Sequence, residues 1–321
     1  MDWSNKTVLI TGGTGSFGRA FVDHLQKHHP PKRLIIFSRD EMKQYDMEQV
    51  HNEDNIRYCL GDVRELDRLK RTFRNVDIVV HAAALKMVLA AEYNPSEAIQ
   101  TNILGGQNVI DAAIEEGVQR VVALSTDKAV SPANLYGATK LCSDRIMIAG
   151  NGYAGGRTIF SVVRYGNVVG SRGSVVPLFQ KLKSTGELPI TDPRMTRFWL
   201  TLDQGVHFVL NAIEAMHGGE IFVPKIPSMR VVDLARAIGP ECRQKVVGIR
   251  PGEKIHETLI SQDDARSTVD LGDYFVIKPY IDWPGEDPWK HGKALEEGFC
   301  YRSDKNDDWL TVEQLTRLVQ P

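Results

Sequence analysis

The chain has 321 residues and a formal net charge of -2, with 42% hydrophobic and 25% charged residues. This length allows one large domain or two lobes around an ample core. The near-neutral charge excludes a generally basic surface for nucleic acid, so an anionic ligand must be held by local groups. The most apolar long window, residues 76–91, is too short and too charged to span a bilayer, because it contains Asp77, His81 and Lys86.

The four cysteines are far apart in the sequence and form no C-x-x-C pair. This pattern indicates reduced thiols rather than a disulfide or zinc framework, and no metal site is predicted. The N-terminus enters a strand-like run without the apolar core of a secretory signal. We therefore expect a cytoplasmic protein without a membrane partner.

The first half of the chain alternates short β-branched runs with helical patterns. Strands are predicted at 7–11, 33–38, 56–60, 77–82, 120–125 and 158–165. Helices are predicted near 15–28, 40–52, 95–117 and 135–149. Apolar strands that alternate with helices are typical of a parallel sheet covered on both faces. The prediction is an α/β fold with a Rossmann-like, doubly wound sheet over residues 1–165.

The second half is less regular. Residues 166–199 are rich in Gly, Pro and Arg, and an amphipathic helix follows at 202–216, where Gly218-Gly219 is suited to end it. A strand is predicted at 220–225, and Ser228 is a candidate cap for a helix over 230–238. We expect a smaller substrate-binding lobe over 166–321, with helix 202–216 packed on the first lobe.

The stretch TGGTGSFG at 11–18 follows the first strand and opens the first helix. Glycines there permit a tight turn, and the helix N-terminus offers free N–H groups to a pyrophosphate. The alternative is a glycine turn that only packs helix on strand. The predicted cofactor-binding residues of this turn are Gly12, Thr14, Gly15, Ser16, Phe17 and Gly18.

The second strand ends at Ser38-Arg39, where an NAD site normally has an acid. A small hydroxyl followed by Arg39, with Lys43 one turn later, favours the 2′-phosphate of NADP. Asp40 and Glu41 make the signal mixed, although they also suit the first turn of a helix. The alternative for Arg39 is an exposed surface arginine.

Two further positions are expected to border the cofactor. Asp62-Val63 follows the third strand, where the adenine edge would lie, and Ala82 opens a run of three alanines after the fourth strand. Small residues at that strand end let a cofactor pass over the edge of the sheet. Tight helix–strand packing explains the alanines equally well.

The stretch STDKAVSPANLYGATK at 125–140 joins the fifth strand to a helix. The i, i+4 spacing puts Tyr136 and Lys140 on one helix face, where an ammonium would lower the pKa of the phenol toward working pH. Asp127 and Lys128 add an acid and an amine. Without the neighbouring motifs, these two residues would be read as a surface ion pair.

Together these motifs resemble the extended short-chain dehydrogenase/reductases. More narrowly, the chain resembles the inverting UDP-N-acetylglucosamine 4,6-dehydratases of flagellin-glycan (pseudaminic acid) and capsular sugar synthesis. The segments that carry the resemblance, in order, are LITGGTGSFG, FSRDEMKQ, GDVRE, HAAALK, AEYNP, LSTDKA, NLYGATK, RYGNVVGSRGSVVP, TDPRMTRFW, GGEIFVPKIPSM and RPGEKIHE, followed by YRSDKNDDWLTVEQL near the C-terminus.

The resemblance implies oxidation at C4, loss of water across C5 and C6, and return of the hydride to C6. It implies that Tyr136 is the base for the C4 hydroxyl and that Lys140 holds the nicotinamide ribose. We assign Lys128 as the C5 base and Asp127 as the acid toward the C6 hydroxyl, with the reverse assignment left open. A basic Lys128 would need a lowered pKa, and Lys140 is the expected neighbouring cation.

The resemblance also implies a substrate site and a homo-oligomer, either a dimer or a hexamer. Lys86 and Asn167 would contact the UDP-sugar, Val168 the nicotinamide, and Arg250 and Glu253 the uridine–diphosphate end. Arg172 and Arg197 are further anion candidates, with solvated arginine as the alternative. His256-Glu257 is expected to belong to a helix that starts near Gly252.

One departure from the family pattern is Lys86-Met87-Val88-Leu89, where a polar residue and a proline are usual in place of Met87 and Leu89. Leu89 removes a backbone constraint and restores an N–H donor. Three alternatives to the inverting dehydratase remain: a 4-epimerase, a retaining dehydratase, and a non-catalytic NADP-binding regulator on the same fold.

Overall fold

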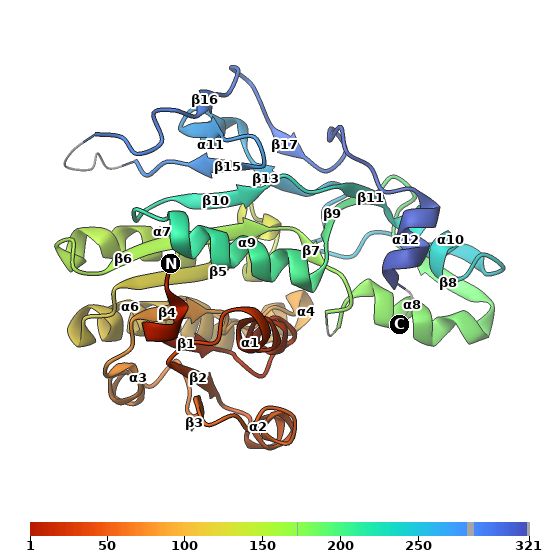
Figure 1. Ribbon diagram of the computed structural model, residues 1–321. Helices are drawn as coiled ribbons and strands as arrows, with labels where there is room; N and C mark the ends of the chain where they lie inside the picture. The colour runs from red at the N-terminus through yellow and green to blue at the C-terminus, as the bar shows by residue number, and fades with distance from the viewer. Residues whose placement is uncertain (172, 281–285, 320–321) are drawn as a thin grey trace.

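The protein is described by a computed structural model covering residues 1–171, 173–280 and 286–319. Its centre is one ten-stranded sheet in the order β16-β14-β15-β10-β6-β5-β4-β1-β2-β3 (Figure 1). The seven strands from β10 to β3 are parallel, and β15, β14 and β16 continue the sheet in antiparallel pairing. These strands are β1 (Thr7–Thr11), β2 (Arg33–Ser38), β3 (Ile56–Leu60), β4 (Ile78–His81), β5 (Arg120–Thr126), β6 (Ile159–Tyr165), β10 (Ile221–Pro224), β14 (Thr268–Asp270), β15 (Tyr274–Ile277) and β16 (Lys293–Ala294).

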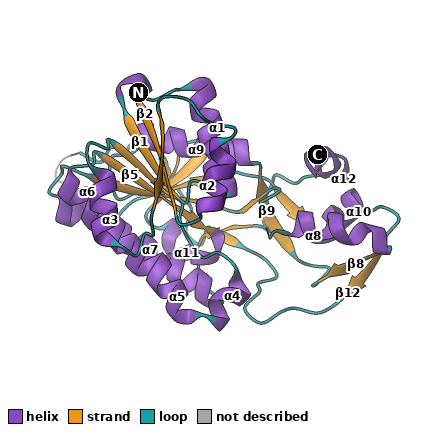
Figure 2. Ribbon diagram, turned by 90° about the horizontal axis from the view of Figure 1, so that it is seen from below, coloured by secondary structure: helices purple, strands orange, loops and turns teal. Residues whose placement is uncertain are grey.

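The central strands are buried on both faces because helices cover both sides of the sheet. Helices α1 and α9 pack together on one side, and α3, α6 and α7 pack together on the other (Figure 2). The helices are α1 (Ser16–His28), α2 (Glu41–Glu48), α3 (Leu66–Phe73), α4 (Val88–Tyr93), α5 (Pro95–Ile99), α6 (Gly105–Glu116), α7 (Leu135–Ala154), α8 (Val175–Leu182), α9 (Leu202–Ala215), α10 (Val231–Ile238), α11 (Gln262–Ala265) and α12 (Val312–Val319).

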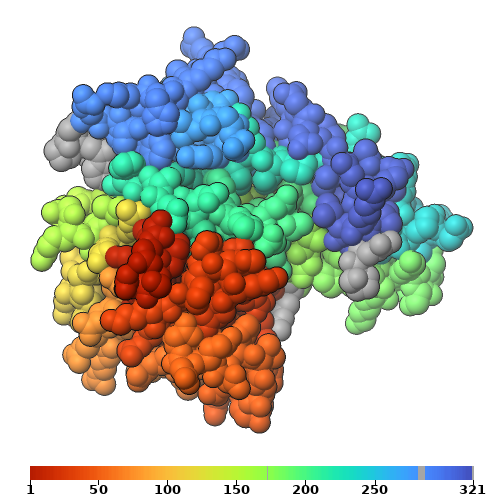
Figure 3. All heavy atoms as spheres, viewed as in Figure 1, coloured from red at the N-terminus to blue at the C-terminus, as the bar shows by residue number. Residues whose placement is uncertain are grey.

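A second, smaller core lies beside the sheet and projects from the body of the molecule (Figure 3). It is formed by apolar side chains from α8, α10, α12 and short strands, with Trp199 and Phe179 among its largest buried members. The short strands are β7 (Asn167–Val168), β8 (Glu187–Ile190), β9 (Thr196–Leu200), β11 (Ser228–Arg230), β12 (Arg243–Val246), β13 (Thr258–Ile260) and β17 (Tyr301–Arg302).

The predicted α/β class and the first six strands are confirmed, each strand ending within one residue of its predicted limits. The carboxyl ends of β1, β2 and β4 lie in register, with Thr11 opposite both Phe37 and His81. The large core also extends past residue 165, because β10, β14 and β15 contribute Phe222, Val269 and Phe275 to it.

The predicted helices agree less closely. The helix expected over 95–117 is divided into α5, a π-helical turn at Gln100–Leu104, and α6. Asn102 in that turn donates to the Leu85 carbonyl at 3.0 Å and to Thr139 Oγ1 at 2.9 Å, and so ties the loop after β4 to α7. The helices α3, α4, α8, α11 and α12 were not predicted.

The predicted cap of α10 is wrong, and the glycines predicted to end α9 lie beyond the end of that helix. Ser228 does not cap α10, because it lies within β11 and its Oγ accepts from the Asn306 amide at 3.0 Å. Helix α9 ends at Ala215, and Met216 already has extended backbone angles, before Gly218 and Gly219 adopt positive φ. None of the described helices is both long and apolar enough to cross a membrane.

Candidate active site

The glycine-rich turn after β1 brings bare backbone to the carboxyl edge of the sheet. Gly12 has φ +68°, and a Cβ there would lie 2.9 Å from Ala83 Cα. A Cβ on Gly18 would collide with the backbone of Gly13. Gly15 is the N-cap of α1 and offers no side-chain cap, so the positive end of this helix faces the turn through its backbone. The turn therefore fits the pyrophosphate of a dinucleotide.

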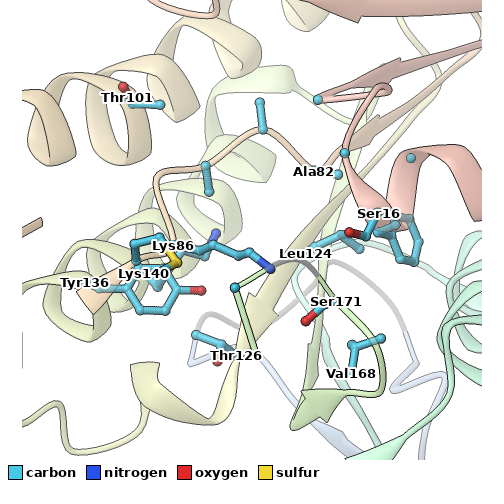
Figure 4. Close-up of a pocket in the computed structure, with 18 of the residues that line it drawn as sticks. Ser16, Ala82, Lys86, Thr101, Leu124, Thr126, Tyr136, Lys140, Val168 and Ser171 are labelled. Atoms are coloured by element: carbon cyan, nitrogen blue, oxygen red, sulfur yellow. The ribbon is translucent and has the colours of Figure 1, made fainter. Parts of the chain in front are cut away.

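A cavity of about 940 Å³ extends from this turn across the sheet edge to residues 250–253. Figure 4 shows Lys86, Tyr136 and Lys140 together, with Ser16 and Val168 on another side of the pocket. Nearly all of the predicted cofactor and substrate residues line it. They are Gly12, Thr14, Gly15, Ser16, Phe17, Gly18, Ser38, Arg39, Lys43, Asp62, Val63, Ala82, Lys86, Tyr136, Lys140, Asn167, Val168, Arg250 and Glu253.

Three predicted residues differ from this pattern. Arg197 is absent from the cavity lining, because its guanidinium donates to the backbone carbonyls of residues 196, 254 and 255 at 2.7–3.0 Å. The interpretation of Arg197 as an anion-binding residue is therefore not supported. Asp127 lies behind the cavity wall and is fully buried. Arg172 lies outside the described residues.

At the end of β2, Arg39 is half exposed and its Nη1 lies 3.5 Å from Asp62 Oδ2. The Lys43 ammonium contacts the carboxylate of Asp40, which caps α2 by accepting from the Lys43 amide at 3.0 Å. Asp40 therefore belongs to the start of α2, in agreement with its suitability for the beginning of a helix. Ser38 Oγ accepts from the Gln44 amide at 3.0 Å, so Gln44 fixes this hydroxyl at the cavity.

The helix that carries Tyr136 and Lys140 begins directly beside the end of β5. Asn134 caps α7, because its Oδ1 accepts from the Gly137 amide at 2.8 Å. A Cβ on Gly137 would collide with the Lys128 carbonyl, so α7 packs closely on the 3₁₀ turn Asp127–Ala129. This contact brings Asp127, Lys128 and Tyr136 together.

Lys128 lies between two buried carboxylates. Its Nζ is 3.0 Å from Asp127 Oδ1 and 3.3 Å from Glu257 Oε1. Burial acts to lower the pKa of Lys128, but the two carboxylates outweigh it and raise that pKa above its usual range. The expectation of a lowered pKa beside Lys140 is therefore wrong. Burial raises the pKa of Asp127, which favours the protonated acid.

The surroundings of Tyr136 also differ from the expectation. Burial raises the pKa of Tyr136 to about 12, and the main groups that oppose this rise are Lys128 and Thr126, which shares a hydrogen bond with the phenol. Lys140 is not among the largest influences on this pKa. Burial lowers the pKa of Lys140 itself, and Asp144 acts against that shift. In the protein alone, the neighbour that favours the phenolate is Lys128.

The other end of the cavity holds polar atoms without a partner among the described residues. Asn167 Oδ1 and Glu253 Oε2 are buried and accept no hydrogen bond. Arg250 Nη1 lies 3.7 Å from Glu253 Oε1 and is half exposed. Burial lowers the pKa of Lys86. This set of groups offers donors and acceptors to a polar, anionic ligand.

The segment before β13 contains Glu257, which was predicted to belong to a helix and not to the site. The helix expected from Gly252 is absent, and residues 251–257 form turns and bends. This chain path brings Glu257 to Lys128, while His256 Nδ1 lies 2.8 Å from Thr196 Oγ1, away from the pair. The signal in the sequence is the place of Glu257 at the end of RPGEKIHE, a segment that carries the resemblance. No recognisable spacing connects Glu257 to Lys128.

Met87 and Leu89 both line the cavity. Met87 precedes α4 and lies against the loop after β7, where a Cβ on Gly173 would be 3.0 Å from the Met87 sulfur. Leu89 lies in the first turn of α4. The two departures from the family pattern thus border the site.

Away from the cavity lining, His24, Asp203 and His207 place one potential metal ligand each within 4.8 Å of one another, at the contact of α1 and α9. His207 and Asp203 are exposed. None of these three residues lines the cavity.

Comparison with known proteins gives consistent relatives. Residues 8–279 match the model of a family described as polysaccharide biosynthesis protein. The chain is 52% identical to a protein of Campylobacter jejuni named UDP-N-acetylglucosamine 4,6-dehydratase (inverting), over 99% of this chain and 98% of that one. It is 44% identical to a UDP-glucose 4-epimerase of Rickettsia prowazekii, over 85% and 83% of the two chains.

Solved structures agree with this grouping. Pen from Bacillus thuringiensis has a TM-score of 0.91 and 38% identity, with 99% of this chain and 98% of that chain covered. A dTDP-glucose 4,6-dehydratase, DesIV from Streptomyces venezuelae, solved with NAD and TYD bound, has a TM-score of 0.73. At 24% identity, over 86% of this chain and 93% of that one, DesIV supports the fold alone.

Proposed function

Because the chain belongs to the polysaccharide-biosynthesis family that includes inverting UDP-N-acetylglucosamine 4,6-dehydratases, we propose that it dehydrates UDP-N-acetylglucosamine. The product would be UDP-2-acetamido-2,6-dideoxy-β-L-arabino-hex-4-ulose, formed with inversion at C5. The enzyme would be a hydro-lyase, since one water leaves and no net oxidation occurs.

One observation carries the proposal. Tyr136, Lys140 and Lys128 line a single cavity between the glycine-rich turn and Arg250, with Asp127 3.0 Å from Lys128. A simple oxidoreductase needs only the tyrosine and a lysine. The additional acid and amine provide what elimination requires, namely a base for one carbon and a proton donor for the departing hydroxyl.

We propose that the cofactor is NADP, which when bound would supply the acceptor for the C4 hydride and the donor of the hydride to C6. Structures with the same fold contain NAD, so the choice between the two rests on this chain's own residues. Arg39 and Lys43 line the cavity beside Ser38, and no acid occupies position 38 or 39 to receive a ribose 2′-hydroxyl. Lys140 would hold the nicotinamide ribose.

In the first step, the phenolate of Tyr136 would take the proton of the C4 hydroxyl as the C4–H bond breaks. The phenol has a pKa of about 12 in the free protein, so phenolate formation is costly at neutral pH. Lys128 is the largest influence against that rise. The ammonium would therefore help the first step before the amine takes part in the second.

In the second step, a base would remove the C5 proton while an acid protonates the departing C6 oxygen. The raised pKa of Asp127, caused by burial, supports Asp127 as the acid. Lys128 would act as base after passing a proton to Asp127 across their 3.0 Å contact. That single transfer leaves a neutral amine and a protonated acid, so the two groups titrate as a pair.

The substrate would lie between the two cores of the protein. We propose that Lys86, Asn167, Arg250 and Glu253 hold the UDP-sugar, because Asn167 and Glu253 have buried oxygens without partners. The lobe that closes over the substrate would be the small core of α8, α10 and α12 rather than all of 166–321.

We also propose a homo-oligomer. Several large apolar side chains from the segment that borders the cavity are exposed and would be covered by a second copy of the chain. They are Met87, Leu89, Tyr93, Ile99 and Leu104.

The proposal is tested by incubating the protein with UDP-N-acetylglucosamine and analysing the nucleotide sugar by mass spectrometry. We expect a product lighter by one water, without added cofactor if NADP is retained in the purified protein. A product of unchanged mass that co-migrates with the C4 epimer would support the epimerase alternative, which the Rickettsia relative's name favours.

A further inference from the structure

Glu257 is a buried carboxylate that belongs neither to the cavity lining nor to the predicted catalytic residues. It is 2% exposed, and its Oε1 lies 3.3 Å from Lys128 Nζ and 3.8 Å from Arg197 Nε. Its Oε2 is buried without a hydrogen-bond partner among the described residues. Its backbone is held by Ser303, whose Oγ accepts from the Glu257 amide at 3.0 Å.

Two carboxylates therefore share the Lys128 ammonium, but their other neighbours differ. Glu257 also has Arg197 close by, whereas the other hydrogen bond that Asp127 accepts from a described side chain comes from the Thr126 hydroxyl, at 2.9 Å. Burial acts to raise the pKa of Glu257, but Lys128, Arg197 and Lys254 together bring it below its ordinary value. Burial raises the pKa of Asp127, and Glu257 adds to that rise. Of the two carboxylates, Glu257 is therefore the one that stays ionised, and Asp127 is the one that more readily takes up a proton.

We infer that Glu257 is a positioning residue for the acid/base pair: as the ionised counter-ion of Lys128, it holds the ammonium in place and sets the pH range in which Asp127 and Lys128 exchange protons with the sugar. The inference rests on the proposed dehydration. It does not depend on which partner is the acid, because a nearby negative charge raises the pKa of both groups.

Several ionisable groups surround Lys128 and Glu257. Four elements contribute groups: the 3₁₀ turn after β5, the strand β9, the loop before β13 and the helix α7. The ionisable groups that face Lys128 or Glu257 are Asp127, Arg197, Lys254 and Tyr136. Lys254 donates to the Val130 carbonyl at 2.6 Å, which fixes it near the pair.

The test is the pH dependence of kcat for dehydration by Glu257→Gln, a substitution that keeps the shape and removes the charge. The pKa values of both Asp127 and Lys128 should fall. We expect both limbs of the plot of kcat against pH to move to lower pH by about one unit or more. A charge as close as Glu257 is to Lys128 shifts a pKa by about 1–3 units. KM should change little, because Glu257 does not line the cavity.

Two further variants separate charge from structure. Glu257→Asp keeps the carboxylate and should leave the profile near that of the wild type. Glu241→Gln removes one exposed carboxylate outside the cavity lining and should leave it unmoved. A Glu257→Gln profile that keeps its wild-type pH limits, with only a lower kcat, would overturn the inference.

A second readout separates this inference from the proposed function. The side-chain titration of Lys128 is followed in the free protein by NMR of ¹³C-labelled lysine, with its signal identified from Lys128→Arg. The midpoint should be lower in Glu257→Gln than in the wild type, and an equal midpoint contradicts the inference. If the wild type releases no water but the midpoint moves, the proposed function fails and the charge relationship stands.

Discussion

The side-chain amide of Asn134 donates to the carbonyl of Gly252 at 2.8 Å, while its oxygen accepts from the Gly137 amide at 2.8 Å. One residue thus caps the helix that carries Tyr136 and fixes the loop that carries Arg250 and Glu253. The catalytic helix and the substrate end of the cavity are joined through this side chain.

Replacement of Asn134 separates these two roles. Asn134→Ala should lower the free energy of unfolding by about 1 kcal/mol for the lost cap, and by a similar amount for the lost bond to Gly252. Asn134→Ser keeps the cap, so it should recover the stability lost with the cap but not the stability lost with the Gly252 bond. Denaturant unfolding measures both losses, and both variants should raise KM for the UDP-sugar. An unaltered KM in Asn134→Ser would contradict the role of the Gly252 contact.

The ionisation of Tyr136 should respond to Lys128 rather than to Lys140. Because the Lys128 ammonium lowers the pKa of the phenol, Lys128→Met should raise that pKa further above about 12. Less phenolate then forms at any given pH. The measurement is the ultraviolet absorbance of phenolate in cofactor-free protein at the highest pH at which it stays folded, with Tyr136→Phe as the blank. Equal effects of Lys128→Met and Lys140→Met would contradict this account.

Arg39 should distinguish NADP from NAD. A charge-assisted bond to the 2′-phosphate contributes about 1.5–3 kcal/mol, so Arg39→Ala should weaken NADP binding by about 10- to 100-fold. NAD binding should hardly change. Lys43→Ala should have a smaller effect, because Asp40 already engages that ammonium. Titration of apoprotein with each cofactor gives the answer, and equal losses for both cofactors would argue against an NADP site.

The role of the glycine-rich turn after β1 can be tested by replacing Gly18, with the replacement of Gly152 as a matched control. Gly18→Ala places a methyl group against the backbone of Gly13, so we expect a loss of about 1–3 kcal/mol in stability and impaired cofactor binding. Gly152 lies in α7 with nothing within 4 Å of a Cβ. Gly152→Ala should therefore stabilise the protein by up to about 1 kcal/mol. Thermal unfolding of both variants, with and without cofactor, makes the comparison.

Local sequence patterns were sufficient to predict the part of the site that is built on the parallel sheet. The run TVLIT and the glycines after it define a strand and a turn within a few residues of each other, and the turn geometry follows from the lack of a Cβ. The Tyr136/Lys140 spacing likewise follows from helical periodicity. These features need no information about distant parts of the chain.

The electrostatics of the acid/base pair could not be predicted in this way. The pKa of Lys128 depends on Glu257, which reaches it only through the turns of residues 251–257. Those turns have no hydrophobic period, and a helix was predicted there instead. The prediction that Arg197 binds an anion is unsupported for a related reason. The partners of its guanidinium are backbone carbonyls, which no sequence motif reveals.

Dehydration with inversion at C5 can be tested directly by one measurement. UDP-N-acetylglucosamine is incubated with the protein in deuterated water, and the sugar is followed by NMR. We predict a 4-keto-6-deoxy product with deuterium at C5 and the ring couplings of the L-arabino configuration. The D-xylo configuration at C5, or a C4 epimer that has lost no water, would contradict the account.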